Sequence, residues 1–174
     1  DSDKSRAAYE VIKAEANGAE IRLVYVDLSS IQSIKTAAEE ITNTHPHIDI
    51  LINNAGLLKR KPERSVDGIE MTYAVNLFAP FLLTNLLLPL IKKSESGRII
   101  NLTSELYKKG KVELETFSSV EKFDGSKAYA NSKLMVVITT LALSNKLKDT
   151  NITVNCVHPG VVGTDVMRDY PKWM

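Results

Sequence analysis

Three short apolar runs in this chain of 174 residues each end in a cluster of polar or turn-forming residues, and this arrangement restricts the fold most. The clusters are Asn53, Asn54, Ala55 and Gly56; Asn101, Leu102, Thr103 and Ser104; and His158, Pro159 and Gly160. Each run predicts a buried strand. Ligands of open α/β sheets bind in the crevice outside the carboxyl ends of the strands, so the three clusters indicate one site.

Helical patterns separate the apolar runs. Helices are predicted at about 4–16, from 29 or 30 to 44, at 67–91 and at 126–146, and strands at 21–26, 49–52, 98–102 and 152–157. This alternation is typical of a parallel sheet whose strands are joined by helical crossovers. We expect a single α/β domain over residues 1–174. Residues 105–124 predict a long loop of the kind that usually has a function.

Composition excludes several classes of protein. The chain is 44% hydrophobic with a net charge of +1, and its basic residues are scattered without interleaved aromatics, which argues against nucleic-acid binding. Cys156 is the single cysteine, so there is no disulfide framework. No metal site is predicted. The apolar stretch 77–91 is too short and too broken to span a bilayer, and a buried helix is expected there.

A Tyr-x-x-x-Lys pair occurs three times, at Tyr9 and Lys13, at Tyr107 and Lys111, and at Tyr129 and Lys133. Only the last pair lies on a predicted helix that follows a strand ending in Ser104. Side chains four residues apart share one helix face, which brings the Lys133 ammonium close to the Tyr129 phenol. We expect this charge to lower the pKa of Tyr129, which could then exchange a proton with a substrate oxygen held by Ser104.

Together these motifs resemble the short-chain dehydrogenase/reductase family over nearly the whole chain. The matching positions are 53–56, Ser104, 129–133 and Pro159–Gly160. The resemblance implies a Rossmann-like, doubly wound parallel sheet that binds NAD or NADP. It implies catalytic roles for Asn76, Ser104, Tyr129 and Lys133. It also implies cofactor contacts by Asp27, Asn53, Asn54, Ala55, Gly56, Tyr129, Lys133, Pro159, Gly160 and Thr164.

The long segment between Ser104 and Tyr129, called the excursion below, and the sequence of residues 81–87 are similar to the retinol dehydrogenase branch of that family. This resemblance implies a lipophilic or retinoid-like alcohol or carbonyl substrate and favours NADP. Membrane anchors in that branch lie upstream of the residues present here, so none is visible in this chain. The expected location stays open between the cytoplasm and the cytosolic side of an organelle membrane.

The chain departs from the family pattern at both ends. None of its eight glycines forms the Gly-rich turn that would hold a pyrophosphate, so a first strand–helix–strand unit is expected to be missing, together with the last strand. The strand at 49–52 should then have either a gap or a rearranged neighbour beside it. We expect this chain alone to bind NAD(P) weakly or not at all and to be inactive.

Structural roles for the same residues remain alternatives. Asn53 and Asn54 could satisfy turn backbone, Asn76 could be a bonded core residue, and His158 is expected to be structural. A second hypothesis for the whole chain is a non-catalytic, truncated family member that acts by association. The resemblance implies a homodimer through the helices at 67–91 and 126–146.

Overall fold

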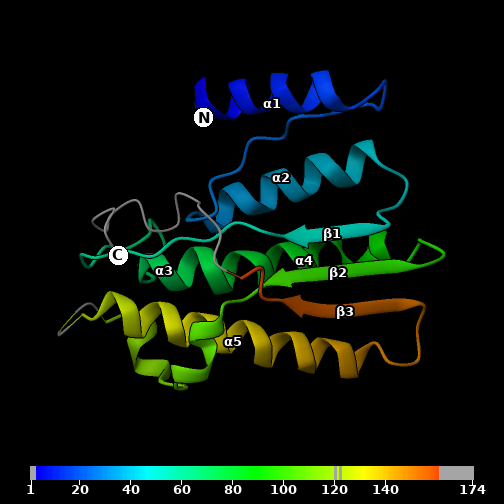
Figure 1. Cartoon of the computed structure of the whole chain (residues 1–174). Coiled ribbons are helices and arrows are strands. Elements are labelled where there is room, and N and C mark those ends of the chain that lie inside the picture. The colour runs from blue at the N-terminus through cyan, green and yellow to red at the C-terminus, as the bar shows by residue number, and fades with distance from the viewer. Residues whose placement is uncertain (1–2, 120, 122, 161–174) are drawn as a thin grey trace.

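The computed structural model describes residues 3–119, 121 and 123–160, and it confirms an α/β arrangement with a parallel sheet (Figure 1). The predicted helices are present with shifted bounds, as are the strands predicted at 49–52, 98–102 and 152–157. The elements are α1 Asp3–Glu15, α2 Ile31–Thr44, β1 Ile50–Asn53, α3 Met71–Tyr73, the π-helical η1 Ala74–Phe78, α4 Ala79–Ile91, β2 Gly97–Leu102, the 3₁₀ helices η2 Glu105–Lys109 and η3 Leu114–Phe117, α5 Gly125–Lys146 and β3 Ile152–Val157.

The sheet places the three polar clusters at one edge. Its order is β1-β2-β3, and both pairs of neighbouring strands are parallel. Asn53 lies opposite Asn101, and Leu102 lies opposite Val157, so the three strands end together. The segments 54–58, 103–110 and 158–160 therefore leave the sheet from the same edge.

One face of the sheet forms the core with α2, α4 and α5. Ile99 and Val154 point to this face and are fully or nearly buried, and alternation places their strand neighbours on the other face. Ile152 of β3 belongs to the same cluster, and the helices and the residue after α5 contribute Ala38, Leu87, Leu90, Ile91 and Leu147. On the opposite face, Ile50 and Ile52 of β1 are 52% and 57% exposed.

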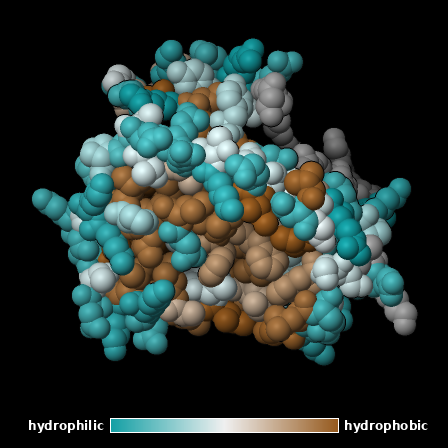
Figure 2. Space-filling view, turned by 180° about the vertical axis from the view of Figure 1, so that it is seen from behind, coloured by the Kyte–Doolittle hydropathy of each residue, from teal (hydrophilic) through white to brown (hydrophobic). Residues whose placement is uncertain are grey.

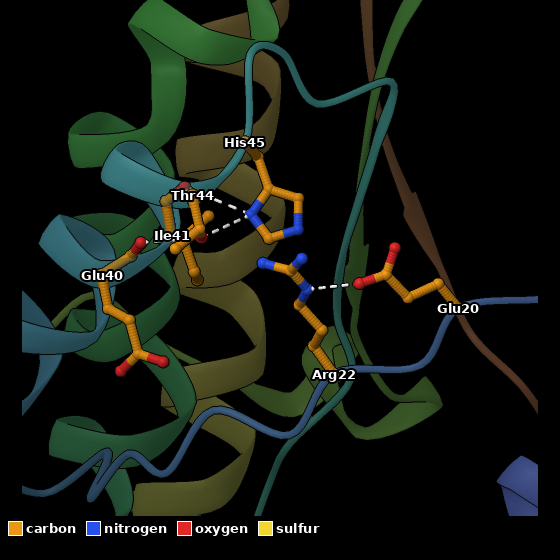
Figure 3. A network of polar contacts seen from close by, with 6 residues as sticks. All are labelled: Glu20, Arg22, Glu40, Ile41, Thr44 and His45. Carbon is orange, nitrogen blue, oxygen red and sulfur yellow. Dashed lines mark hydrogen bonds and ion pairs between the residues drawn. The ribbon is translucent and has the colours of Figure 1, made fainter.

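The strand predicted at 21–26 is wrong. Residues 19–27 have no regular secondary structure, and Leu23, Tyr25 and Val26 are exposed. A strand exists only through hydrogen bonds to a neighbour, and no strand among the described residues pairs with this segment. Its Arg22 instead pairs with Glu20, as Figure 3 shows together with the polar contacts at the end of α2. β1 therefore forms an edge of the described sheet.

The helix predicted to begin at 67 begins instead at Met71. Glu70 caps it, because its buried carboxylate accepts hydrogen bonds from the amides of Thr72 and Tyr73 and from the Thr72 hydroxyl. Asp67 has a different role, since its carboxylate accepts the Ile31 amide at the start of α2. An acidic side chain at each position stabilises a helix N-terminus.

The π-helical turn η1 was not predicted. In it the Ala79 amide bonds to the Ala74 carbonyl, five residues back. Pro80 explains this geometry, because proline lacks the N–H that an α-helix would donate to the carbonyl of Asn76, and its ring would clash with that carbonyl. A single widened turn relieves both conflicts and leaves Asn76 buried inside it.

The continuous helical run 71–91 is longer than the stretch that the sequence singled out. By length and composition alone it could cross a membrane, since an 18-residue stretch of it has a mean hydropathy of 1.9. Half of that stretch is buried inside the protein, and the core helices of soluble proteins can be equally long and apolar. The packing of Leu87, Leu90 and Ile91 against the sheet supports the predicted core helix.

Replacing Glu70 with alanine is expected to destabilise the intact protein by about 2 kcal/mol, because buried amides of Thr72 and Tyr73 lose their acceptor. Urea unfolding measures this difference. Glu39→Ala on the exposed side of α2 is the matched control and should change stability by less than about 0.5 kcal/mol. Equal midpoints for the two variants would contradict the capping role.

Candidate active site

Helix α5 carries Tyr129 and Lys133 on one buried face. Asp124 starts the helix by accepting hydrogen bonds from the amides of Ser126 and Lys127. The two side chains are then one turn apart, 9% and 4% exposed, and Lys133 Nζ lies 5.7 Å from the centroid of the Tyr129 ring. The structure therefore brings this Tyr-x-x-x-Lys pair together.

Ser104 reaches the same place from the end of β2. It is half-buried and caps η2, with its Oγ accepting the Leu106 amide at 3.3 Å. The hydroxyl also interacts with the Tyr129 phenol, where it acts to lower the pKa of Tyr129. A hydroxyl and a phenol from two distant segments thus face one another at the carboxyl edge of the sheet.

Asn76 joins this group from the π-helical turn. Its side chain accepts the Leu57 amide and donates to the Leu57 carbonyl, both at 2.9 Å, and also donates to Ser132 Oγ at 3.1 Å. Gly56 lies beside both side chains: a Cβ there would be in ordinary van der Waals contact with Lys133 Nζ at 3.4 Å and with Asn76 Oδ1 at 3.5 Å. Asn76 therefore holds the 54–58 segment against α5, near Lys133.

Burial strongly changes the chemistry of Lys133. Its Nζ donates to the Leu102 carbonyl at 2.8 Å, and the hydroxyl of Thr103 donates to the Lys133 carbonyl. No carboxylate neutralises the ammonium at either contact, and desolvation lowers the pKa of Lys133 to about 8. Near neutral pH this lysine is close to the point at which it exchanges a proton.

The predicted lowering of the Tyr129 pKa is wrong for this structure. Burial raises the pKa of Tyr129, and the Ser104 hydroxyl opposes that rise only in part. The nearby ammonium alone would lower this pKa, but the phenol also loses its surrounding water on burial, and that loss raises it. Tyr129 is therefore held in its protonated form, ready to donate.

The residues expected to contact a cofactor separate into two groups. Asn54 and Ala55 are exposed at the carboxyl edge, as are Pro159 and Gly160, with Gly160 at φ +81°. The Asn53 side chain turns inward and donates to Thr84 Oγ1 and Asn101 Oδ1 instead. Its side-chain amide therefore braces the sheet against α4.

Asp27 is exposed, and its carboxylate accepts both the amide and the hydroxyl of Ser29, which lower the pKa of Asp27. These bonds shape the turn that leads into α2. Thr164 lies outside the described residues. His158 is exposed, and its Nε2 lies 3.9 Å from a Glu105 carboxylate oxygen.

The residues present suit one half of a nicotinamide dinucleotide. Lys133 Nζ and the Tyr129 phenol lie close together and offer the hydrogen-bond donors that a ribose and its ring would need. For the pyrophosphate, the eight glycines of the chain include no G-x-G pair to bring backbone amides together at a helix N-terminus. The described part of the chain contains no cluster of three or more His, Cys, Asp or Glu side chains suited to a metal.

Two residues have a role in the site that the sequence did not predict: Ser132 and Asn101, the latter expected only as part of a polar cluster. Ser132 is fully buried and donates to the Tyr129 carbonyl while accepting from Asn76. Asn101 donates to Thr140 on α5 and accepts from Asn53, linking β1, β2 and α5. The sequence feature that could have indicated them is a polar residue inside a predicted element: Asn101 lies in a strand, and Ser132 lies in a helix three residues after Tyr129.

Comparison with known proteins identifies the class. The family profile for short chain dehydrogenases matches residues 1–174, and the chain belongs to that family. Retinol dehydrogenase 14 of Mus musculus is 41% identical over 143 residues, which are 82% of this chain and 43% of that protein. The resemblance to retinol dehydrogenases is thereby confirmed. The chain spans about half the length of the curated relatives it matches.

Solved structures agree with this assignment. An uncharacterised protein from Mycobacterium Paratuberculosis superposes with a TM-score of 0.80 at 27% identity, covering 97% of this chain and 59% of that one. A blue fluorescent protein from a metagenomic library, solved in complex with NADPH, has a TM-score of 0.73 at 29% identity, covering 95% and 63%.

Replacing Lys133 with methionine is expected to stabilise the intact protein at pH 7. The unfolded chain binds more protons than the folded one between about pH 8 and 10.5, so the stability of the unaltered protein rises with pH across that window. Below it, burying the ammonium costs about 3 kcal/mol, partly offset by about 1 kcal/mol from the bond to the Leu102 carbonyl.

Urea unfolding at pH 7 and pH 10.5 measures this effect. The methionine variant should be more stable by about 2 kcal/mol at pH 7 and should lose that advantage by pH 10.5. Lys148→Met, at an exposed lysine, is the control. A pH-independent difference between Lys133→Met and the unaltered protein would contradict the burial cost.

Proposed function

We propose that the intact protein is an NAD(P)-dependent oxidoreductase that interconverts an alcohol and a carbonyl by hydride transfer. The observation that carries this proposal is the meeting of Ser104, Tyr129 and Lys133 at the carboxyl edge of a parallel sheet. Family membership supports the same reaction class. Because the chain spans about half the length of the relatives it matches, the activity is proposed for the whole protein, called the intact protein here.

Each residue has a distinct role in this proposal. Tyr129, protonated by burial, donates its proton to a carbonyl oxygen in the reductive direction and takes it back in the other. Ser104 holds that oxygen by a hydrogen bond. Lys133 and Asn76 position the 54–58 segment and the ribose end of the dinucleotide. The dinucleotide supplies the hydride when it is bound.

The proposed substrate is a lipophilic alcohol or carbonyl of the retinoid kind, and the proposed cofactor is NADP. The names of the relatives support the substrate class, since retinol dehydrogenases recur among them. NADP is supported by solved neighbours described with NADP or NADPH.

Tyr129→Phe is expected to lower kcat by at least about a hundredfold, because general acid–base catalysis contributes about 10²–10⁴. The measurement is NADPH-dependent reduction of retinal by the intact protein. Tyr107→Phe is the matched control, since Tyr107 belongs to another Tyr-x-x-x-Lys pair, and its rate should be unchanged. Equal rates for Tyr129→Phe and the unaltered protein would exclude the proposed acid.

A second candidate function, association through helices, is supported by the outer face of α4 and α5. Figure 2 shows apolar residues gathered around a hollow on one face of the molecule. Between α4 and α5, a hollow of about 200 Å³ is lined by residues that include Leu77, Phe81 and Leu143. Leu141 is 63% exposed and Phe81 is 54% exposed. We propose a homodimer through this face.

Leu141→Glu is expected to shift a dimer to monomer in sizing chromatography, because a charge would be buried in the contact. Leu114→Glu is the matched control, since Leu114 is equally exposed but lies on η3. Titration with NADPH runs in parallel. Dimerisation of the 174-residue chain without nucleotide binding would favour the association function, whereas an unaltered elution volume for Leu141→Glu would exclude this face as the dimer contact.

A further inference from the structure

The excursion between Ser104 and Tyr129 is fixed to α5 at Gly110. A Cβ at this position would lie 2.5 Å from the Ala130 carbonyl oxygen and 2.8 Å from Leu134 Cβ. Side-chain atoms are not tolerated at such distances from a helix backbone. The excursion therefore meets α5 backbone to backbone, one residue after Tyr129.

Asn131 provides the polar half of this contact. Its side chain is 1% exposed, and its Oδ1 accepts the Lys111 amide at 2.7 Å. Its Nδ2 donates to Glu113 Oε2 at 3.4 Å, and the same carboxylate oxygen pairs with Lys127 Nζ at 2.8 Å. A single buried amide on α5 thus satisfies two successive parts of the excursion.

A second anchor follows a few residues later. The Tyr73 hydroxyl and Thr116 Oγ1 are hydrogen-bonded at 2.8 Å, and the Glu70 amide donates to the Phe117 carbonyl at 2.7 Å. The Tyr73 and Phe117 rings are in contact in a tilted arrangement, with 4.8 Å between their centroids and 58° between their planes. The Asn131 side chain also interacts with the Tyr73 hydroxyl, so the two anchors touch.

These anchors bear on Ser104 because η2 connects them to it. Ser104 caps the first turn of η2, and Gly110 ends that helix with its amide bonded to the Tyr107 carbonyl. A 3₁₀ helix of five residues is about 10 Å long, and fixing one end leaves the other little freedom. The position of the Ser104 hydroxyl then depends on the contact at Gly110 and Lys111.

We propose that Asn131 is a positioning residue: by holding Lys111 and Glu113 it fixes η2 on α5 and keeps the Ser104 hydroxyl against Tyr129. The excursion is then a fixed wall of the active site. This inference rests on the proposed oxidoreductase function, in which Ser104 and Tyr129 share one substrate oxygen. Catalytic geometry is sensitive to shifts of about 1 Å, so a residue that touches no substrate can still set the rate.

The experiment compares Asn131→Ala with the unaltered intact protein in NADPH-dependent reduction of retinal. We expect kcat to fall by about ten- to a hundredfold while the KM for NADPH stays within about twofold. Hydrogen exchange of the Lys111 amide should accelerate by about tenfold or more, because its acceptor is lost. Asn145→Ala, an exposed asparagine of the same helix, should change neither measurement.

A paired substitution separates positioning from simple loss of stability. Asn131→Asp alone places two carboxylates against one another and should lower kcat. Adding Glu113→Gln restores the hydrogen bond with donor and acceptor exchanged, because the glutamine amide nitrogen can donate to the aspartate carboxylate. Lys127 can still donate to the glutamine oxygen. The double variant should recover kcat to within about threefold of the unaltered protein.

The outcomes discriminate between the claims. Unchanged kcat in Asn131→Ala despite faster exchange at Lys111 would overturn the proposal, and so would a joint loss of kcat and NADPH binding that the double variant fails to restore. If the unaltered protein transfers no hydride, the proposed function fails instead. The exchange comparison would still decide whether Asn131 fixes the excursion.

Discussion

The buried first half of α5 is the contact on which the rest of the site depends. Residues 128–133 are all 9% exposed or less, and they contact the end of β2, Asn76 of the π-helical turn, the 54–58 segment at Gly56 and the excursion. The sheet edge, the π-helical turn and the 3₁₀ helices are each held in place by this one stretch of helix. Its burial depends in turn on the strand ends, since Thr103 and Leu102 satisfy Lys133.

The same contact is costly in energy. The Lys133 ammonium bonds to a backbone carbonyl and not to a carboxylate, and burial lowers its pKa to about 8, so this lysine lowers the stability of the folded state near neutral pH. Burial also raises the pKa of Tyr129, so the two pKa values change in opposite directions. The phenol keeps its proton more firmly, and the amine releases its proton more readily. Such paired departures are typical of functional sites, where stability is exchanged for reactivity.

Periodicity predicted most of the fold, and it failed where structure depends on partners. The helical spacing from residue 29 or 30 to 44 and the apolar runs predicted as strands at 49–52 and 152–157 were sufficient by themselves to predict α2, β1 and β3. Residues 21–26 carry an equally good strand pattern, yet a strand needs a neighbour, and local sequence does not supply one. Pro80, which causes the π-helical turn, is visible in the sequence. That this turn buries Asn76 could not be predicted, because the helix was expected to start at residue 67, four residues before its observed start.

The Tyr-x-x-x-Lys motif points to the site but does not show which residues hold the site together. In Tyr-x-x-x-Lys the three unspecified positions serve in the sequence only as spacing, yet here all three make contacts. Ala130 and Asn131 contact the excursion at Gly110 and Lys111, and Ser132 contacts Asn76 of the π-helical turn. One helical turn therefore aligns the phenol and the amine while its intervening residues hold two other chain segments beside them. Because these contacts use backbone groups and a buried amide, they leave no apolar or charge pattern in the sequence. The proposed catalytic residues could be predicted from spacing, whereas the residues proposed to position them become apparent only when the segments are brought together.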